Sequence, residues 1–177
     1  MFLGLDISTS IIGFCILEEN SSLKEIGSID LTKEKSIFKK ASIFREKVEQ
    51  LSDKHKIKKV FVEENLQAFR PGLSSAKTIV TLARFNGMCS LIASEVFTFD
   101  PEFINVNAAR KSIGFKKKKD KSSNTKQQVL DHVSILEPKI QWPTKTLKSG
   151  PRKDTVVLQN CCYDMADAYV IVRSQLS

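Results

Sequence analysis

The chain is poor in the residues that build zinc sites, disulfide frameworks and glycine-rich phosphate loops. It has four cysteines with no C-x-x-C pair, and its two histidines lie far from them along the chain. This spacing excludes the usual zinc sites and favours cysteines that act as small buried hydrophobic residues in a reducing compartment. Seven glycines among 177 residues argue against the phosphate loops of nucleotide-binding folds.

Long apolar runs are scarce as well. We find none that approaches the roughly 18 residues that a membrane-spanning helix needs. At the N-terminus, Asp6 interrupts a very short apolar run that no basic region precedes, so no signal peptide is expected. We therefore expect a cytoplasmic protein with no membrane partner. A hydrophobic content of 41% in 177 residues fits one domain, spanning residues 1–177, with one sizeable core.

Positive charge is concentrated in one part of the chain. Residues 111–153 contain twelve lysines and arginines against three acids, a net charge of +9, whereas the whole chain carries +8. Such a segment suits a polyphosphate partner, because the release of counterions from phosphates supplies much of the affinity.

Hydrophobic periodicity predicts alternating strands and helices. We expect strands over residues 2–6, 11–17, 23–31, 58–63, 96–99 and 103–106, and helices over 37–55, 75–94, 107–113, 125–133 and 155–173. Residues 114–124 are rich in lysine and polar, which predicts a mobile loop, and three prolines in 137–153 predict irregular structure. This order of elements favours a mixed α/β sheet covered by helices.

Four acidic residues lie in three separated places, each beside a stretch expected to form regular structure. Asp6 and Glu63 each end a predicted strand, and Asp164 and Asp167 share one face of the last predicted helix. Taken singly, Asp6 could cap the turn that follows it, and the two helical aspartates could be solvated. Brought together, such acids would repel one another unless a divalent cation relieved the repulsion. With the basic segment, they indicate a metal-dependent enzyme that acts on nucleic acid.

The order and spacing of these motifs resemble the ribonuclease H-like superfamily and, within it, the RuvC-type Holliday-junction resolvases. The motifs are Leu3-Gly4-Leu5-Asp6 with Gly13 in the next strand, Phe61-Val62-Glu63, the helix from Ser75 to Gly87, and Asp164-Met165-Ala166-Asp167-Ala168. The resemblance implies a mixed β-sheet flanked by helices in a single domain. Bacterial members often have Pro-Gly after the first aspartate, whereas Ile7-Ser8 follows here, which fits a phage-encoded or divergent member.

The resemblance also implies the chemistry. It makes Asp6, Glu63, Asp164 and Asp167 catalytic residues that bind two Mg²⁺ ions, for which Mn²⁺ would substitute. It selects Glu63 over its neighbour Glu64, which is left as a supporting or solvated acid. The implied reaction is hydrolysis of DNA phosphodiester bonds at a four-way junction, one ion activating water and the other stabilising the leaving 3′ oxygen. The products would carry 5′-phosphate and 3′-hydroxyl ends.

Several basic and apolar residues are expected to contact DNA. They are Leu66, Phe69, Arg70, Lys111, Lys116, Lys117, Lys118 and Lys119. Lys126 falls on a family position that assists catalysis and Lys111 on another, although either could simply contact a phosphate or be solvated. Phe69 could wedge between bases at the junction centre or could belong to the core. Trp142 could likewise stack on bases or pack inside.

The expected partner is branched DNA, above all four-way junctions, in the cytoplasm of a bacterial or phage-infected cell. A homodimer is expected through the helix around residues 75–94, because resolution needs paired nicks on opposite strands and Gly87 favours close approach of another helix or subunit. Three alternatives remain open: another ribonuclease H-like nuclease acting on RNA–DNA hybrids or branched and flap DNA, an ATP-binding actin-like fold, and a non-catalytic junction-binding protein.

Overall fold

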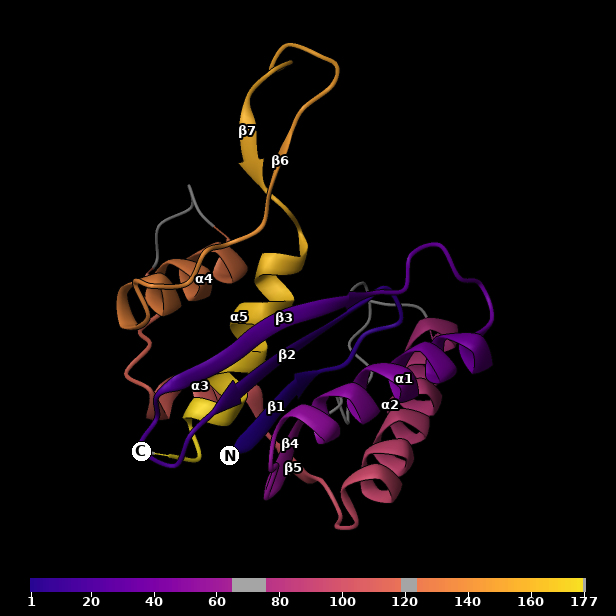
Figure 1. Ribbon diagram of the computed structural model, residues 1–177. Helices are drawn as coiled ribbons and strands as arrows, with labels where there is room; N and C mark the ends of the chain where they lie inside the picture. The colour runs from indigo at the N-terminus through magenta and orange to yellow at the C-terminus, as the bar shows by residue number, and fades with distance from the viewer. Residues whose placement is uncertain (65–75, 119–123, 177) are drawn as a thin grey trace.

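A five-stranded mixed sheet forms the centre of the molecule (Figure 1). The computed structural model describes residues 1–64, 76–118 and 124–176. The strands of the sheet are β1 (Phe2–Asp6), β2 (Ile11–Leu17), β3 (Leu23–Asp30), β4 (Lys59–Glu63) and β5 (Glu102–Ile104). They lie in the order β3-β2-β1-β4-β5. The pairs β1–β2 and β2–β3 are antiparallel, whereas β1–β4 and β4–β5 are parallel, so β1 and β4 end at the same edge.

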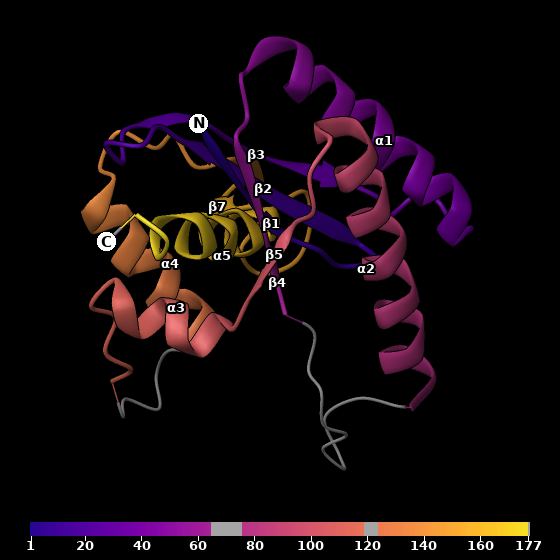
Figure 2. The same ribbon diagram turned by 90° about the horizontal axis from the view of Figure 1, so that it is seen from below.

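Helices cover both faces of this sheet, which gives a three-layer molecule (Figure 2). The helices are α1 (Ile37–Lys54), α2 (Ala76–Phe97), α3 (Val106–Ser112), α4 (Thr125–Leu136) and α5 (Cys161–Arg173). One core cluster joins α1 and α2 to one face, and a second joins α3, α4 and α5 to the other. The prediction of a mixed sheet flanked by helices is confirmed.

Strand alternation decides which side chains enter which layer. In β1, Leu3 and Leu5 are fully buried in the core beneath α1 and α2. Successive side chains of a strand point to opposite faces, so Gly4 and Asp6 face α5. In β4, Val60 and Val62 lie in the α1–α2 core while Phe61 packs with α5. The same alternation turns Glu63 toward α5.

Two element predictions are wrong. Residues 96–99 form no strand, because α2 continues through Phe97, whose side chain is buried in the core, and the turn comes at Thr98 with φ of 64°. The last helix starts at Cys161 rather than near residue 155, since β7 (Val156–Leu158) pairs with β6 (Thr144–Thr146) in a separate hairpin. At residues 96–97 helix packing outweighs the strand propensity of Val96 and Phe97, whereas at 156–158 pairing with β6 completes a strand that the β-branched Val156 and Val157 already favour.

Helix α2 corrects a further expectation. By length and composition it is apolar enough to cross a membrane. Within the protein, 33% of its most apolar 18-residue stretch is buried. The core helix of a globular domain passes the same test, and Phe85, Cys89 and Ile92 of α2 pack beneath the sheet. On its remaining surface Val80 is 47% and Leu91 61% exposed. Helix α2 therefore has two apolar faces. One packs beneath the sheet, and the other carries exposed apolar side chains in the single chain.

Candidate active site

The four predicted acids line one cavity of about 240 Å³. It lies where β1 and β4 end, beside the first turns of α5. The lining residues are Asp6, Ile7, Ser8, Glu63, Glu64, Leu82, Arg110, Lys126, Asp164 and Asp167. Side chains separated by up to about 160 positions in the sequence thus converge at one edge of the sheet.

The parallel register of β1 and β4 places Asp6 beside Glu63. Leu5 is paired with Val62, so the next residue of each strand is Asp6 and Glu63 respectively. Both side chains face α5 by strand alternation. The negative charge of Glu63 contributes to raising the pKa of Asp6. Glu64 follows the strand end and also lines the cavity, so both glutamates reach it.

Two glycines bring the helical aspartates to the strand acids. A Cβ atom added to Gly13, which pairs with Asp6, would lie 2.0 Å from the backbone oxygen of Asp164. A Cβ added to Gly4 would lie 2.4 Å from the backbone oxygen of Ala168. Real Cβ atoms essentially never approach a backbone atom so closely. The backbone of α5 therefore rests directly on β1 and β2 because these positions have no side chain.

Burial dominates the electrostatics of the acids. Burial, followed by the charges of Glu63 and the helical aspartates, raises the pKa of Asp6 well above its ordinary value. Burial also raises the pKa of Glu63, and it raises that of Asp164 against the opposing charge of Lys126. Ionisation of the whole set is thus unfavourable without added positive charge.

Two cations of the protein already face this cavity. A guanidinium nitrogen of Arg110 donates a hydrogen bond to Asp167 at 2.7 Å, and both side chains are largely buried. The Nε atom of Arg110 is buried and has no hydrogen-bond partner among the described residues. Nζ of Lys126 lies 3.9 Å from a carboxylate oxygen of Asp164, with the lysine side chain 59% exposed. Lys126 thus lies at the rim and Arg110 inside.

Arg110 was not among the predicted site residues, whereas its neighbour Lys111 was. Lys111 is exposed and does not line the cavity. Successive residues of a helix point about 100° apart, so only one of the pair can face α5. The buried Ala109 marks the inward side of α3. Local sequence could not select Arg110, because the inward side of α3 is known only once α3 packs against α5.

The donor set suits a hard divalent cation. The side chains of the cavity that could bind a metal ion are carboxylates. Mg²⁺ and Mn²⁺ prefer such oxygen ligands. In residues 1–64, 76–118 and 124–176 no group of three or more His, Cys, Asp or Glu side chains is gathered closely enough to hold an ion as it stands. The Arg110–Asp167 ion pair supplies one positive charge at this site.

The predicted DNA contacts lie elsewhere or outside the described residues. Lys116, Lys117 and Lys118 are exposed after α3, and the first and last of them line a separate hollow of about 220 Å³. Leu66, Phe69, Arg70 and Lys119 lie outside the described residues. Trp142 is half-buried against the α3–α5 core, and its indole donates to the Ser134 hydroxyl at 2.9 Å. Trp142 therefore packs against the protein core and is not an exposed residue available to stack on DNA bases.

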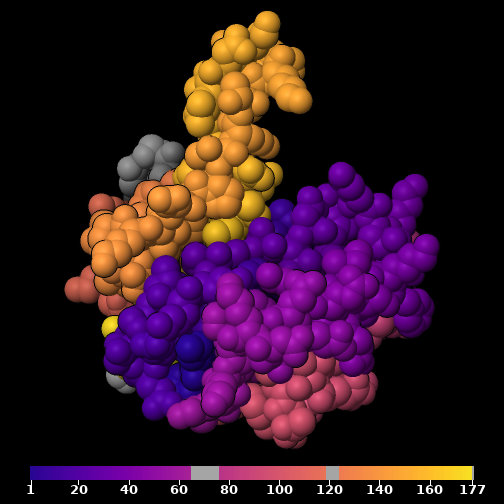
Figure 3. All heavy atoms as spheres, viewed as in Figure 1, coloured from indigo at the N-terminus to yellow at the C-terminus, as the bar shows by residue number. Residues whose placement is uncertain are grey.

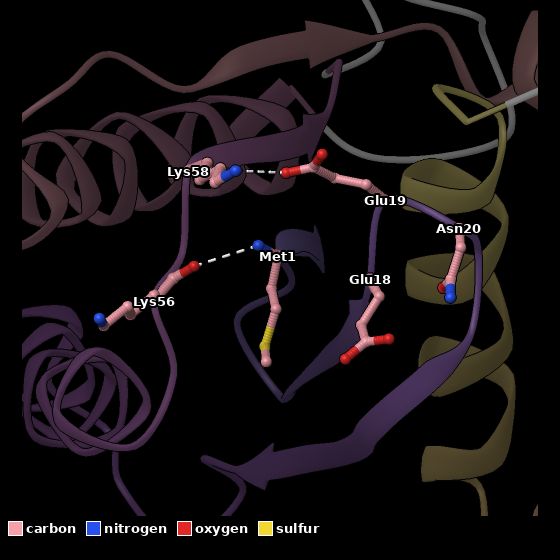
Figure 4. A pocket seen from close by; sticks show the side chains of 6 residues that line it. All are labelled: Met1, Glu18, Glu19, Asn20, Lys56 and Lys58. Atoms are coloured by element: carbon pink, nitrogen blue, oxygen red, sulfur yellow. Dashed lines mark hydrogen bonds and ion pairs between the residues drawn. The ribbon is translucent and has the colours of Figure 1, made fainter.

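A further hollow lies at the opposite edge of the sheet (Figure 4). Its ionic groups are already matched, since Lys58 pairs with Glu19 and the N-terminal amine donates to the carbonyl of Lys56. None of the predicted site residues lines it. The acidic cavity is thus the stronger candidate for chemistry.

Comparisons with known proteins agree with this geometry. No protein-family model matches the chain. The crossover junction endodeoxyribonuclease RuvC of Campylobacter hominis is 31% identical over 123 residues, which cover 68% of this chain and 73% of that protein.

Solved structures show the same fold. RuvC of T. thermophilus in complex with a Holliday junction substrate matches with a TM-score of 0.62 at 15% identity, covering 98% of this chain and 90% of that one. The yeast mitochondrial Holliday junction resolvase Ydc2 matches with a TM-score of 0.56 at 13% identity, covering 99% and 77%. The predicted ribonuclease H-like fold is confirmed, and the chain belongs to the RuvC family of crossover junction endodeoxyribonucleases.

Proposed function

We propose that this protein is a structure-selective endonuclease that resolves four-way DNA junctions by metal-dependent hydrolysis, leaving 5′-phosphate and 3′-hydroxyl ends, and that it acts in the cytoplasm. One observation carries the proposal: Asp6, Glu63, Asp164 and Asp167 reach one cavity from β1, β4 and α5 in a chain of the RuvC family. Four acids that are buried and repel one another make the folded state less stable. A non-catalytic binding protein would gain nothing from them.

The four acids would hold Mg²⁺, two ions per site, with Mn²⁺ as a substitute. When bound, the ions supply an activated water and stabilise the charge on the leaving 3′ oxygen. The protein's own cations have a separate task. Lys126 is exposed at the cavity rim, where its ammonium can attract the scissile phosphate, and Arg110 limits the repulsion between Asp167 and its neighbours.

We further propose that the active form is a homodimer through α2. Its outer surface carries the exposed Val80 and Leu91, and no atom of the described residues lies within 4 Å of the position where a Cβ of Gly87 would stand. Apolar residues that stay exposed in one chain are covered when two copies meet, and Gly87 allows close approach. A two-fold dimer matches the symmetry of paired nicks across a junction.

The exposed lysines of the segment after α3 suit contacts with the DNA backbone. Lys116, Lys117 and Lys118 are the members of this group that the structure describes. Lys119, Lys111 and the apolar and basic residues of the loop after β4 stay predictions. All of these side chains would add affinity that falls as salt rises.

A cleavage panel tests the proposal. The protein is incubated with Mg²⁺ and with four-way junction, flap, linear duplex and RNA–DNA hybrid, each at equal concentration, with a chelator control. We expect symmetric cuts in the junction, ligatable 5′-phosphate ends, and no product with chelator. Preferred cutting of the hybrid would support the alternative nuclease instead, and junction binding without any cutting would support a non-catalytic role.

A further inference from the structure

Residues 144–158 form an arm that stands away from the three-layer body (Figures 1 and 3). The arm consists of β6, β7 and the turn that joins them. Two hydrogen bonds from Gln159 join the two ends of the arm at its base. The Gln159 side chain donates to the carbonyl of Thr144 at 2.8 Å, and its backbone N–H donates to the carbonyl of Pro143 at 2.9 Å. The thiol of Cys162 in α5 also reaches the carbonyl of Pro143, at 3.3 Å.

The tip of the arm is an ordered turn. The backbone N–H of Leu147 donates a hydrogen bond to the carbonyl of Thr155 at 3.0 Å. The backbone N–H of Asp154 donates to the carbonyl of Leu147 at 2.8 Å. Gly150 adopts φ of 82° and Asp154 φ of 66°, conformations that suit glycine and aspartate in tight turns. The backbone of the tip thus has a defined shape.

The arm is strongly basic, and no described residue forms an ion pair with its charges. Lys145, Lys148, Arg152 and Lys153 oppose the single acid Asp154, and all five are exposed. None of the four cations forms an ion pair with a residue that the structure describes, whereas Lys58 and Lys59 at the far edge of the sheet are both paired. Four unpaired cations on a projecting ribbon are available to an anionic partner.

The arm also lacks a packing partner. Val156 is 63% and Leu158 38% exposed, and cross-strand pairing puts both on one face with Thr144 and Thr146. A two-stranded hairpin alone is marginally stable in water, so a surface that covers this face would stabilise the arm. A duplex groove is wide enough to admit a two-stranded ribbon.

The base of the arm lies close in sequence to a residue of the acidic cavity. Its second strand leads into α5, and Asp164 lies in the first turn of that helix. At 1.5 Å per residue, three residues of helix separate Cys161 from Asp164 by about 5 Å along the axis. A DNA duplex whose phosphate enters the cavity therefore passes near the base of the arm.

We infer that the arm grips the duplex next to the cleavage point, its four cations contacting phosphates and its ribbon lying along a groove. The inference rests on the proposed nuclease function and adds to it a second DNA contact outside the acidic cavity. It also explains why much of the basic segment after Lys126 lies on a projecting hairpin and not on the body.

The test compares two variants with equal loss of charge. The arm variant carries Lys145→Gln, Lys148→Gln, Arg152→Gln and Lys153→Gln. The control carries Lys54→Gln, Lys56→Gln, Lys58→Gln and Lys59→Gln, at the edge of the sheet opposite the acids. Junction affinity is measured with chelator over a range of salt, and single-turnover cleavage is measured with Mg²⁺ at saturating protein. Melting temperatures check that both variants fold.

For the arm variant we expect at least about a tenfold weaker junction affinity at physiological salt, and a salt slope lower by about 3 to 4, since each lost phosphate contact removes about 0.9. Backbone footprinting should lose protection on the duplex flanking the cut, while the rate from the saturated complex stays near the parent value. The control should change neither the slope nor the footprint by a comparable amount.

Three results would overturn the inference: an unchanged slope, an equal loss in both variants, or a shift of the arm variant from dimer to monomer with the slope retained. The last would assign the arm to a second copy of the chain. Failure of the proposed function is distinguishable, because the parent protein would then not cut junctions in Mg²⁺, whereas the arm is scored by affinity and footprint alone.

Discussion

At the scale of single residues, the cavity holds charges that the protein balances only in part. Burial raises the pKa of Asp6 and of Glu63, which favours their neutral forms, and Asp167 is held by Arg110. Asp164 has the more distant Lys126. Each arrangement lowers negative charge where burial makes it costly. A divalent cation bound by the carboxylates would offset this negative charge more completely, which is the physical basis of the proposed metal dependence.

Removal of one carboxylate charge should separate cutting from binding. Asp6→Asn keeps the size of the side chain but removes a proposed metal ligand, so we expect a fall in the cleavage rate of about a thousandfold, equivalent to about 4 kcal/mol. Junction affinity should stay the same or rise, because a negative charge near the phosphate is lost. Single-turnover cleavage and chelator-based binding measure the two. Asp53→Asn, at an exposed position of α1, is the matched control and should cut normally.

The raised pKa values of the acids predict a pH-dependent response to metal. Burial raises the pKa of Asp6, Glu63 and Asp164 above the values of the unfolded chain, so the metal-free folded state holds more protons. Its stability therefore falls as pH rises from about 4 through the raised values. Mg²⁺ binds the ionised form, so its stabilising effect should grow over the same range.

Thermal melts with Mg²⁺ and with chelator, from roughly pH 5 to 8, measure this effect. The difference in melting temperature should be larger at the upper end by about 3 °C or more. A double variant with Asp6→Asn and Glu63→Gln should flatten the trend. A difference that is constant with pH would contradict the coupling of metal to these carboxyls.

At the scale of elements, the contact between α5 and the β1–β2 hairpin assembles the site. Most elements follow from local pattern: the hairpin of β1 and β2, the amphipathic α1, and β4 entered from lysines all lie where they were predicted. The two errors, at residues 96–99 and 155–160, occur where β-branched and aromatic residues are used in a helix end and in a hairpin. Local propensity could not decide these, because burial of Phe97 and pairing with β6 are tertiary facts.

A side chain at Gly13 should break this contact. Gly13→Ala would place a Cβ 2.0 Å from the backbone oxygen of Asp164, so α5 must shift. We expect a loss of stability of about 3 kcal/mol or more, and loss of cleavage in any protein that still folds, because both aspartates move with the helix. Denaturant unfolding and cleavage measure the two. Ser28→Ala, directly across the ladder from Gly13, should cost less than about 1 kcal/mol.

At the scale of the whole molecule, acidic and basic surfaces are separated in space. The acids lie in the cavity at one edge of the sheet, while exposed cations lie on the arm and after α3. The apolar outer face of α2 belongs to a third surface, on the opposite side of the sheet from α5. Each surface suits a different partner: metal, DNA and a second copy of the chain.

Charges on the outer face of α2 should prevent dimerisation. In a variant with Val80→Glu and Leu91→Glu we expect a monomer by sedimentation, because burying two carboxylates at an apolar contact is unfavourable. Junctions should then accumulate with a single nick. Ile135→Glu on α4, at a position 77% exposed, is the control and should leave the oligomeric state unchanged. A parent protein that is monomeric at working concentration would contradict the proposed interface.

The sequence by itself determined the order of most elements, the identity of the four acids and the family, because alternation, helical spacing and short motifs are properties of neighbouring residues. Only the tertiary structure decided that Arg110 rather than Lys111 enters the cavity, and that β6 and β7 form a projecting arm. Both depend on which elements pack together. The direction of a side chain on α3 has meaning only once α5 lies beside it, and β7 becomes a strand only because β6 supplies its hydrogen bonds.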